Sequence, residues 1–267
     1  MPKISPLSVV DPKARLAEDV EVGPFCTIGP DVTLGPGNKL MSHVVITGLT
    51  TIGKSNIFHP HCTIGDHPQD LKYKGASTRL EIGDNNQIRE TVTIHTGTEK
   101  GGGVTRVGSG NLLMVNAHIG HDVQLGNRCI IANNVMFAGH VICGDNVAIM
   151  GGVGVHHFVS IGDYAYIAGY ARIHHDVPPF VKVGDADKIR ALNTVGLRRA
   201  GFTEGDIEAL EDVTRRLFVS KEKPFSVTLA EFDLQNGLNP NVKRMVEFLR
   251  RRDTGVNGRY LESLRAR

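Results

Sequence analysis

Apolar residues recur at every sixth position through residues 4–173 of this 267-residue chain. The series is interrupted twice and shifts by one residue after the second interruption. Its members are Ile4, Val10, Leu16, Val22, Ile28, Leu34, Leu40, Ile46, Ile52, Phe58, Ile64, Ile82, Ile88, Ile94, Val107, Leu113, Ile119, Leu125, Ile131, Phe137, Cys143, Ile149, Val155, Ile161, Ile167 and Ile173. A period of six fits neither the 3.6-residue turn of a helix nor the two-residue alternation of a strand. It is typical of a hexapeptide β-helix, in which three short strands form one triangular coil of about 18 residues. We therefore expect a mainly β fold, a prism with these side chains inside.

The two interruptions are expected to leave the prism as surface loops. The first lies near residues 66–79 and reads DHPQDLKYKGASTR, and the second lies near residues 96–106 and reads TGTEKGGGVTR. Loops held on a rigid scaffold are where proteins commonly bind ligands. Both insertions are therefore candidate parts of a functional site.

The hexapeptides stop after Pro178 and Pro179, and the remaining sequence looks helical. Thr203 and Asp206 have the spacing of a capping box. Asn239 followed by Pro240 is typical of a helix N-cap and first turn. We predict a hexapeptide-repeat β-helix over residues 1–185 and a C-terminal α-helical domain over residues 186–267.

The charge distribution favours an acidic protein partner for the C-terminal part. Residues 186–267 contain 16 Lys and Arg against 12 Asp and Glu, whereas the whole chain has a net charge of +2. This weak excess does not indicate a nucleic-acid-binding protein. No signal-like segment precedes the repeat and no apolar run reaches 18 residues. We expect a cytoplasmic protein without stable membrane insertion.

Residues 18 apart should lie above one another on successive coils, about 4.8 Å apart. One such column contains His121, Gly139, His157 and His175, and the next contains Asp122, His140, Phe158 and Asp176. His118 and His156 lie close to these columns in sequence. Histidine exchanges protons near neutral pH, so the cluster is a candidate acid–base site. The two alternatives are a metal site and a row of solvent-facing histidines that has no chemical role.

The residues around His121 suit proton abstraction. Asp122 could orient the His121 ring and stabilise its imidazolium form, as in a catalytic triad. Neighbouring side chains of a regular strand point to opposite faces, so this pairing requires a corner. Gly139, one coil above His121, could expose a backbone N–H as an oxyanion donor; a simple corner glycine is the alternative.

Five segments resemble the UDP-N-acetylglucosamine O-acyltransferase family, which opens lipid A biosynthesis. They are HPQDLKYKG (67–75), IRETVTIHTGT (88–98), NAHIGHDVQLGN (116–127), ANNVMFAGHV (132–141) and DVPPF (176–180). The resemblance extends over the whole chain. It implies a left-handed parallel β-helix and a homotrimer with active sites between subunits.

The resemblance also implies roles for individual residues. His121 would be the general base that takes the proton of the glucosamine 3-hydroxyl group, which attacks the thioester of a 3-hydroxyacyl group on acyl carrier protein. Gly139 would match the oxyanion donor. The positions that would match substrate-binding residues are Asp70, Lys72, His118, His140, His156, His157, Asn193 and Arg199, and Gly169 would limit acyl length. The sequence departs from the family pattern at His157, Val195 and Ala200.

We expect no metal, no cofactor and no covalent acyl-enzyme, because the acyl donor arrives on the phosphopantetheine of acyl carrier protein. A trimeric β-helix zinc enzyme of the carbonic-anhydrase type is the alternative function. Candidate arginines for docking acyl carrier protein are Arg215, Arg216, Arg250, Arg251 and Arg252.

Overall fold

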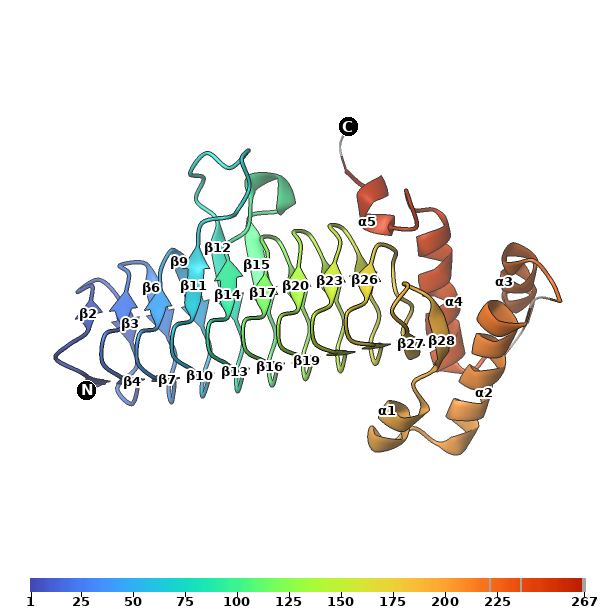
Figure 1. The fold of residues 1–267 in the computed structure, drawn as a ribbon, viewed down its shortest axis with the longest axis horizontal. Helices are drawn as coiled ribbons and strands as arrows, with labels where there is room; N and C mark the ends of the chain where they lie inside the picture. The colour runs from blue at the N-terminus through green and yellow to red at the C-terminus, as the bar shows by residue number, and fades with distance from the viewer. Residues whose placement is uncertain (221, 236, 266–267) are drawn as a thin grey trace.

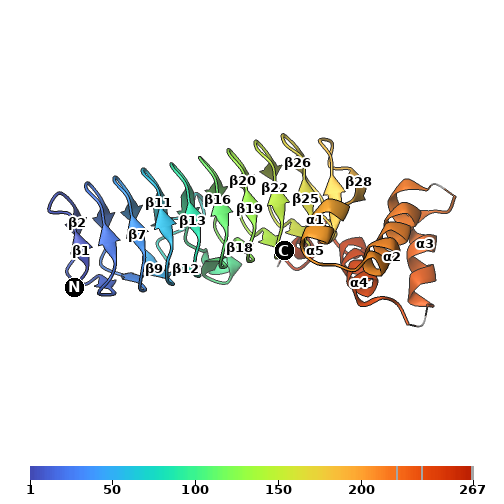
Figure 2. The same cartoon turned by 90° about the horizontal axis from the view of Figure 1, so that it is seen from below.

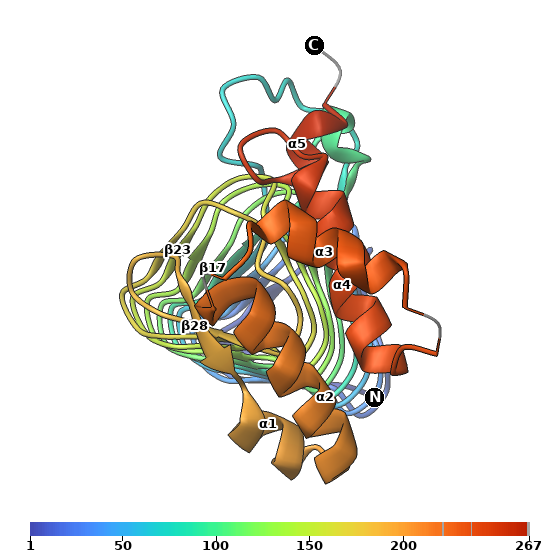
Figure 3. The ribbon, with the colours of Figure 1, turned by 90° about the vertical axis from the view of Figure 1, so that its right-hand side faces the viewer.

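The computed structural model describes residues 1–220, 222–235 and 237–265. Its main body is a long prism of stacked coils, and helices cover one end (Figure 1). Figure 2 shows the coils stacked in order along the prism. Viewed along the prism, the coils superpose into a triangle, with the C-terminal helices across its end (Figure 3).

Three sheets form the three faces of the prism. The first sheet contains β1 (Lys3–Ile4), β4 (Glu21–Val22), β7 (Lys39–Leu40), β10 (Ile57–Phe58), β13 (Gln87–Ile88), β16 (Leu112–Leu113), β19 (Ile130–Ile131), β22 (Ala148–Ile149), β25 (Tyr166–Ile167), β27 (Val181–Val183) and β28 (Ile189–Leu192). The second contains β2 (Val9–Val10), β5 (Thr27–Ile28), β8 (Val45–Ile46), β11 (Thr63–Asp66), β14 (Thr93–His95), β17 (His118–Ile119), β20 (Met136–Phe137), β23 (Gly154–Val155) and β26 (Arg172–Ile173). The third contains β3 (Arg15–Leu16), β6 (Val32–Leu34), β9 (Leu49–Ile52), β12 (Arg79–Ile82), β15 (Val104–Val107), β18 (Gln124–Leu125), β21 (Ile142–Cys143) and β24 (Ser160–Ile161).

The six-residue apolar series forms the core of the prism, as predicted. Every member from Val22 to Ile173 is at most 4% exposed. Ile4 at the start of the series is 41% exposed, because no preceding coil covers it. Strands of successive coils pair in parallel, for example β17 with β20 through His118↔Met136 and Ile119↔Phe137. Stacking on neighbouring coils is what stabilises each repeat.

Both insertions connect the second sheet to the third and therefore leave the prism at the same corner. The first occupies residues 67–78, between β11 and β12, and the second occupies residues 96–103, between β14 and β15. The second contains the short 3-10 helix η1 (Glu99–Gly101). Residues 104–106, predicted as part of the second interruption, belong to β15 because they continue its pairing with β12.

The chain after the repeats forms a hairpin and a set of helices. β27 and β28 pair antiparallel, and the predicted division near residue 185 falls in the turn between them. The helical segments are α1 (Thr194–Arg199), α2 (Glu204–Thr214), the π-helical turn η2 (Arg215–Val219), α3 (Phe225–Asp233), α4 (Pro240–Asp253) and α5 (Tyr260–Ser263). The capping box of Thr203 and Asp206 and the Asn239 N-cap are confirmed. Among the described residues, no helix is sufficiently long and apolar to span a membrane.

Candidate active site

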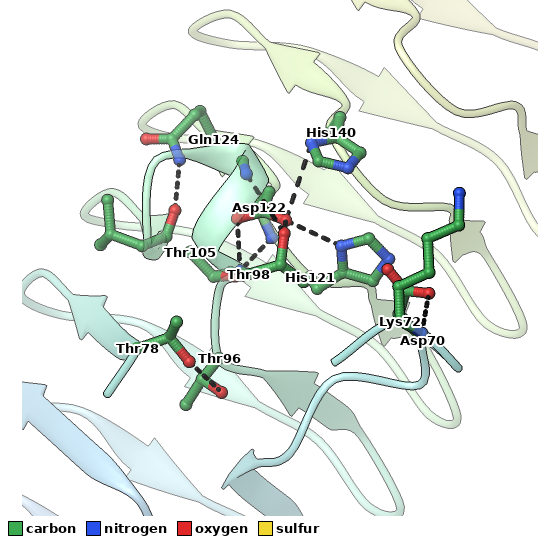
Figure 4. A network of polar contacts seen from close by, with 12 residues as sticks. Asp70, Lys72, Thr78, Thr96, Thr98, Thr105, His121, Asp122, Gln124 and His140 are labelled. Atoms are coloured by element: carbon green, nitrogen blue, oxygen red, sulfur yellow. Dashed lines mark hydrogen bonds and ion pairs between the residues drawn. The ribbon is translucent and has the colours of Figure 1, made fainter. Parts of the chain in front are cut away.

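His121 and Asp122 form a turn at the corner from which both insertions leave. Asp122 has a left-handed backbone conformation, with φ of 61°. This conformation brings two neighbouring side chains together, and His121 Nδ1 lies 2.8 Å from Asp122 Oδ2 (Figure 4). The structure thus supplies the corner that the pairing requires.

The Asp122 carboxylate is held from two sides. The Thr98 backbone N–H donates to Oδ1 at 2.7 Å, and the Thr98 hydroxyl donates to Oδ2 at 2.6 Å. The Asp122 side chain is only 1% exposed. Because an ionised carboxylate only accepts hydrogen bonds, the His121 proton belongs on Nδ1. Nε2 of His121 is then left unprotonated and can accept a proton from a substrate.

Gly139 lies directly against the His121 ring, as the 18-residue spacing predicted. A Cβ atom at Gly139 would come within 2.6 Å of His121 Nε2, so a side chain there would displace the ring. The Gly139 carbonyl accepts a hydrogen bond from Phe158 N–H at 3.3 Å. Within the described part of the chain, no acceptor is assigned to the Gly139 N–H, which leaves this donor available beside His121 Nε2.

His140 and His118 flank the pair as neutral rings. His140 Nδ1 lies 3.6 Å from Asp122 Oδ2, and its ring stacks on Phe158 with a centroid distance of 4.5 Å. Burial lowers the pKa of His140, although Asp122 partly opposes this. His118 Nδ1 lies 2.8 Å from the Thr93 hydroxyl. Burial, with smaller contributions from the charges of His95 and His121, lowers the pKa of His118 to about 4.

The first insertion places Asp70 and Lys72 near His121 (Figure 4). The Lys72 backbone N–H donates to Asp70 Oδ1 at 2.9 Å. This hydrogen bond lowers the pKa of the Asp70 carboxyl, with smaller contributions from the charges of His121, Lys72 and His140. Lys72 itself is exposed. The loop therefore adds an anionic and a cationic group beside the corner.

His156 and His157 extend the site by about two coils. Their ring centroids are 5.4 Å apart, and His157 is the more exposed of the two. Burial lowers the pKa of His157, as do the charges of His156 and His121. His175, in the same sequence column, instead pairs with Asp187 at 2.7 Å.

Three predicted site residues lie away from His121 within one chain. Gly169 is at the corner between the first and second sheets, between β25 and β26. Asn193 is the N-cap of α1, where its Oδ1 accepts from Gly196 N–H and its amide donates to the Tyr164 carbonyl at 2.9 Å. Arg199 is exposed at the end of α1, at the far end of the prism (Figure 1).

Sequence reasoning did not single out three residues that shape this site. Thr98 holds Asp122, and Thr93 bonds His118. His95 is buried with Nδ1 2.6 Å from the His67 carbonyl oxygen, and its Nε2 has no hydrogen-bond partner among the described residues. All three lie in the segment TIHTGT (93–98), which is part of the family resemblance. That resemblance was the sequence feature from which these residues could have been identified.

Among the described residues, His121, Asp122 and His140 form a group that could hold a metal ion. Each offers one ligand atom, and these atoms lie within 4.8 Å of one another. In the arrangement seen, Asp122 Oδ2 already accepts hydrogen bonds from Thr98 and His121. A cation bound through His121 Nδ1 would have to replace the proton on that nitrogen.

The low pKa of His118 predicts a pH-dependent stability. Between pH 6.5 and pH 4 the unfolded chain binds a proton at this residue that the folded chain does not bind. The free energy of unfolding should therefore fall as pH falls through this window, by at most about 1.4 kcal/mol per pH unit from this group. Denaturant unfolding of the protein and of His118→Gln at pH 7.5 and 5 would test this. The variant should lose less stability on acidification, and equal losses would contradict the assignment.

The prism and its corner site define a hexapeptide-repeat transferase. The family model "Bacterial transferase hexapeptide (six repeats)" matches residues 4–48 and 105–139. A second model, "UDP N-acetylglucosamine O-acyltransferase; Domain 2", matches residues 176–257.

Solved structures match this chain over both the hexapeptide repeats and the C-terminal part. LpxA from Acinetobacter baumannii is 40% identical, with a TM-score of 0.86, over 91% of this chain and 95% of that chain. LpxA of Bacteroides fragilis, a UDP-N-acetylglucosamine acyltransferase, is 38% identical, with a TM-score of 0.87, over 92% and 96%. The Arabidopsis UDP-N-acetylglucosamine acyltransferase is 36% identical, with a TM-score of 0.84, over 94% and 97%. The chain belongs to the UDP-N-acetylglucosamine O-acyltransferase family. The predicted family and the left-handed β-helix with a C-terminal helical part are confirmed.

Proposed function

We propose that this enzyme transfers a 3-hydroxyacyl group from acyl carrier protein to the glucosamine 3-hydroxyl of UDP-N-acetylglucosamine, the first step of lipid A biosynthesis. The observation that carries this proposal is the His121–Asp122 pair, with a 2.8 Å hydrogen bond and the His121 ring seated on Gly139. Membership of the family supports the choice of substrates. The test is an assay of purified protein with both substrates, read as formation of the acylated UDP-sugar by mass spectrometry.

In the proposed reaction, His121 Nε2 takes the proton of the sugar 3-hydroxyl as its oxygen attacks the thioester carbonyl. Asp122 stabilises the imidazolium that forms. The Gly139 N–H donates to the oxyanion of the tetrahedral intermediate. When the intermediate collapses, the carbon–sulfur bond breaks and His121 returns its proton to the phosphopantetheine sulfur. No covalent acyl-enzyme, metal or cofactor takes part.

The flanking residues are proposed to bind the two substrates. The UDP-sugar and the acyl chain would contact Asp70, Lys72, His118, His140, His156 and His157. Gly169, Asn193 and Arg199 would reach a substrate only across a subunit boundary, since within one chain they lie away from His121. In line with the family resemblance, we propose a homotrimer whose active sites lie between subunits, which would bring these residues to a substrate.

A zinc enzyme of the carbonic-anhydrase type is the second candidate, because His121, Asp122 and His140 bring three ligand atoms together. The two candidates differ in what activity requires. Elemental analysis of the purified protein, followed by assays in the presence of a chelator, separates them. Stoichiometric zinc with chelator-sensitive turnover would favour the zinc enzyme, whereas chelator-resistant acyl transfer supports the proposed reaction.

The basic C-terminal part is proposed to dock acyl carrier protein. Arg215 and Arg251 are exposed, whereas Arg216 lies over the Phe232 ring and pairs with Glu231, and Arg252 is half-buried. Exposed charges are screened over about 8 Å at physiological ionic strength. We expect KM for acyl carrier protein to rise with salt, and Arg251→Glu to raise KM for acyl carrier protein but not for the UDP-sugar. A KM for acyl carrier protein unaffected by both changes would contradict this docking surface.

Gly169 is proposed to leave the acyl groove open for a long chain, of about fourteen carbons. A Cβ atom at this position would lie 3.2 Å from the Gly151 carbonyl oxygen, so a side chain there would be in tight contact with the neighbouring coil. Each methylene excluded from a groove forfeits about 0.8 kcal/mol of burial. Gly169→Met should shift kcat/KM towards shorter 3-hydroxyacyl donors by at least about tenfold. The measurement is kcat/KM for a series of acyl carrier protein donors, and an unchanged profile would remove Gly169 from this role.

A further inference from the structure

The second insertion folds over the carboxylate that orients His121. Thr98 is the N-cap of η1, and its Oγ1 accepts a hydrogen bond from Gly101 N–H at 3.2 Å. Gly101 packs so tightly on Asp122 that any side chain there would overlap the carboxylate. Thr98 and Asp122 are 6% and 4% exposed. The insertion therefore excludes water from one side of the His121–Asp122 pair.

Thr98 supplies one hydrogen-bond donor to each oxygen of Asp122. Its backbone N–H bonds Oδ1 at 2.7 Å and its hydroxyl bonds Oδ2 at 2.6 Å. Two bonds from one residue to both oxygens fix the plane of the carboxylate as well as its position. At the other end of Asp122, the backbone N–H donates to Thr105 Oγ1 at 2.8 Å. Asp122 is thus restrained at both its backbone and its side chain.

The direction of the hydroxyl bond follows from its partners. A threonine hydroxyl has a single hydrogen to donate. Gly101 N–H occupies an acceptor position on Oγ1, so the hydrogen is free for Asp122 Oδ2. A bond to an ionised acceptor is stronger than a neutral one. The hydroxyl therefore anchors Oδ2, the oxygen that also accepts from His121.

Two histidines lie within reach of this oxygen. His121 Nδ1 is 2.8 Å from Oδ2, whereas His140 Nδ1 is 3.6 Å away. Rotation of the carboxylate could alter which ring it pairs with. The Thr98 hydroxyl opposes that rotation, since it holds Oδ2 in line with His121.

We propose that Thr98 is a positioning residue that directs the Asp122 carboxylate to His121 rather than to His140, and so keeps the His121 proton on Nδ1. This inference rests on the proposed function of His121 as the base. Thr98 does not touch the reacting atoms, so it acts through Asp122. Its backbone N–H persists in valine and serine variants, whereas its hydroxyl can be removed with little change in side-chain shape.

The test compares Thr98→Val, which lacks the hydroxyl, with Thr98→Ser, which keeps it. Thr98→Val should lower kcat by about 10- to 100-fold and change KM for the UDP-sugar less than about twofold. Thr98→Ser should recover kcat to within about threefold of the unaltered protein. Thr96→Val is the matched control, because the Thr96 hydroxyl lies on the same insertion but bonds Thr78 and the Asp66 carbonyl instead of Asp122 (Figure 4).

A second measurement needs no substrate and thus separates this inference from the proposed function. In protein carrying ¹⁵N-labelled histidine, the His121 signals, assigned by their loss in His121→Ala, report which ring nitrogen bears the proton. Thr98→Val should move them towards a mixture of the two tautomers, and Thr98→Ser and Thr96→Val should not.

Two results would overturn the inference. One is Thr98→Val with kcat within threefold of the unaltered protein and unchanged His121 signals. The other is Thr98→Ser as impaired as Thr98→Val in both measurements, which would assign the effect to packing. If the unaltered protein transfers no acyl group, the proposed function fails while the ¹⁵N comparison still tests the position of the His121 proton.

Discussion

Replacing His121 by alanine should lower kcat by about 10²- to 10⁴-fold, which is the usual contribution of a positioned general base. The ring is 12% exposed and is held between Asp122 and Gly139, so its removal takes away the proton acceptor without disturbing the apolar core. The fold should survive, because the core side chains at this corner are Ile119 and Val123. The measurement is kcat and KM with both substrates, alongside thermal unfolding.

His43→Ala is the matched control for this experiment. His43 also sits at a corner of the prism and stacks between Phe25 and His61, but this corner joins the first and second sheets. Its loss should leave kcat within about twofold. Activity of His121→Ala within a few fold of the unaltered protein would show that the base lies elsewhere, with His140 the nearest alternative.

The prism could be predicted because the six-residue period of the sequence follows directly from the geometry of each coil. Each hexapeptide supplies one strand and one corner, so a side chain such as Phe137 could be assigned to the core from spacing alone. The same arithmetic placed Gly139 over His121. It depends on coils of constant length, and it therefore works only where no insertion intervenes.

Structural features that interrupt the six-residue period could not be predicted from this spacing. Thr98 lies 24 residues before Asp122, a separation that is not a multiple of 18, because the second insertion lengthens its coil. The left-handed conformation of Asp122 was required by the proposed pairing but is not encoded by a glycine. Gly169 is 48 residues past His121, which is not a multiple of 18, so it lies at a different corner of the prism from His121.

The C-terminal part shows the limit of local signals. Helix caps at Thr203 and Asn239 were predicted because capping chemistry lies within a few residues. β27 continues the first sheet in parallel with β25, and β28 then adds an antiparallel strand, which has no hexapeptide signature. Helix α3 begins after Pro224 with no side-chain cap, so the capping rules gave no signal for its start.

Asp122→Asn should be nearly as harmful as loss of the base, with kcat lowered by about 10²- to 10⁴-fold; the upper figure is that of the corresponding change in a serine-protease triad. An asparagine has a single acceptor oxygen, yet Thr98 donates to both oxygens of Asp122. If the amide nitrogen faces His121, it donates to Nδ1 and moves the ring proton to Nε2, where it blocks proton abstraction. If it faces the Thr98 N–H, two donors oppose each other in a buried site.

The chain offers a matched control for this substitution in a second histidine–aspartate pair. Asp187 accepts from His175 Nδ1 at 2.7 Å and from the backbone N–H groups of His174 and His175, but it lies in the turn between β27 and β28. Asp187→Asn removes the same charge from the same kind of pair and should leave kcat within about twofold. Equal losses of kcat in Asp122→Asn and Asp187→Asn would assign the effect to general electrostatics or stability. A selective loss in Asp122→Asn, with KM for the UDP-sugar little changed, would identify Asp122 as the group that sets the protonation of the His121 base.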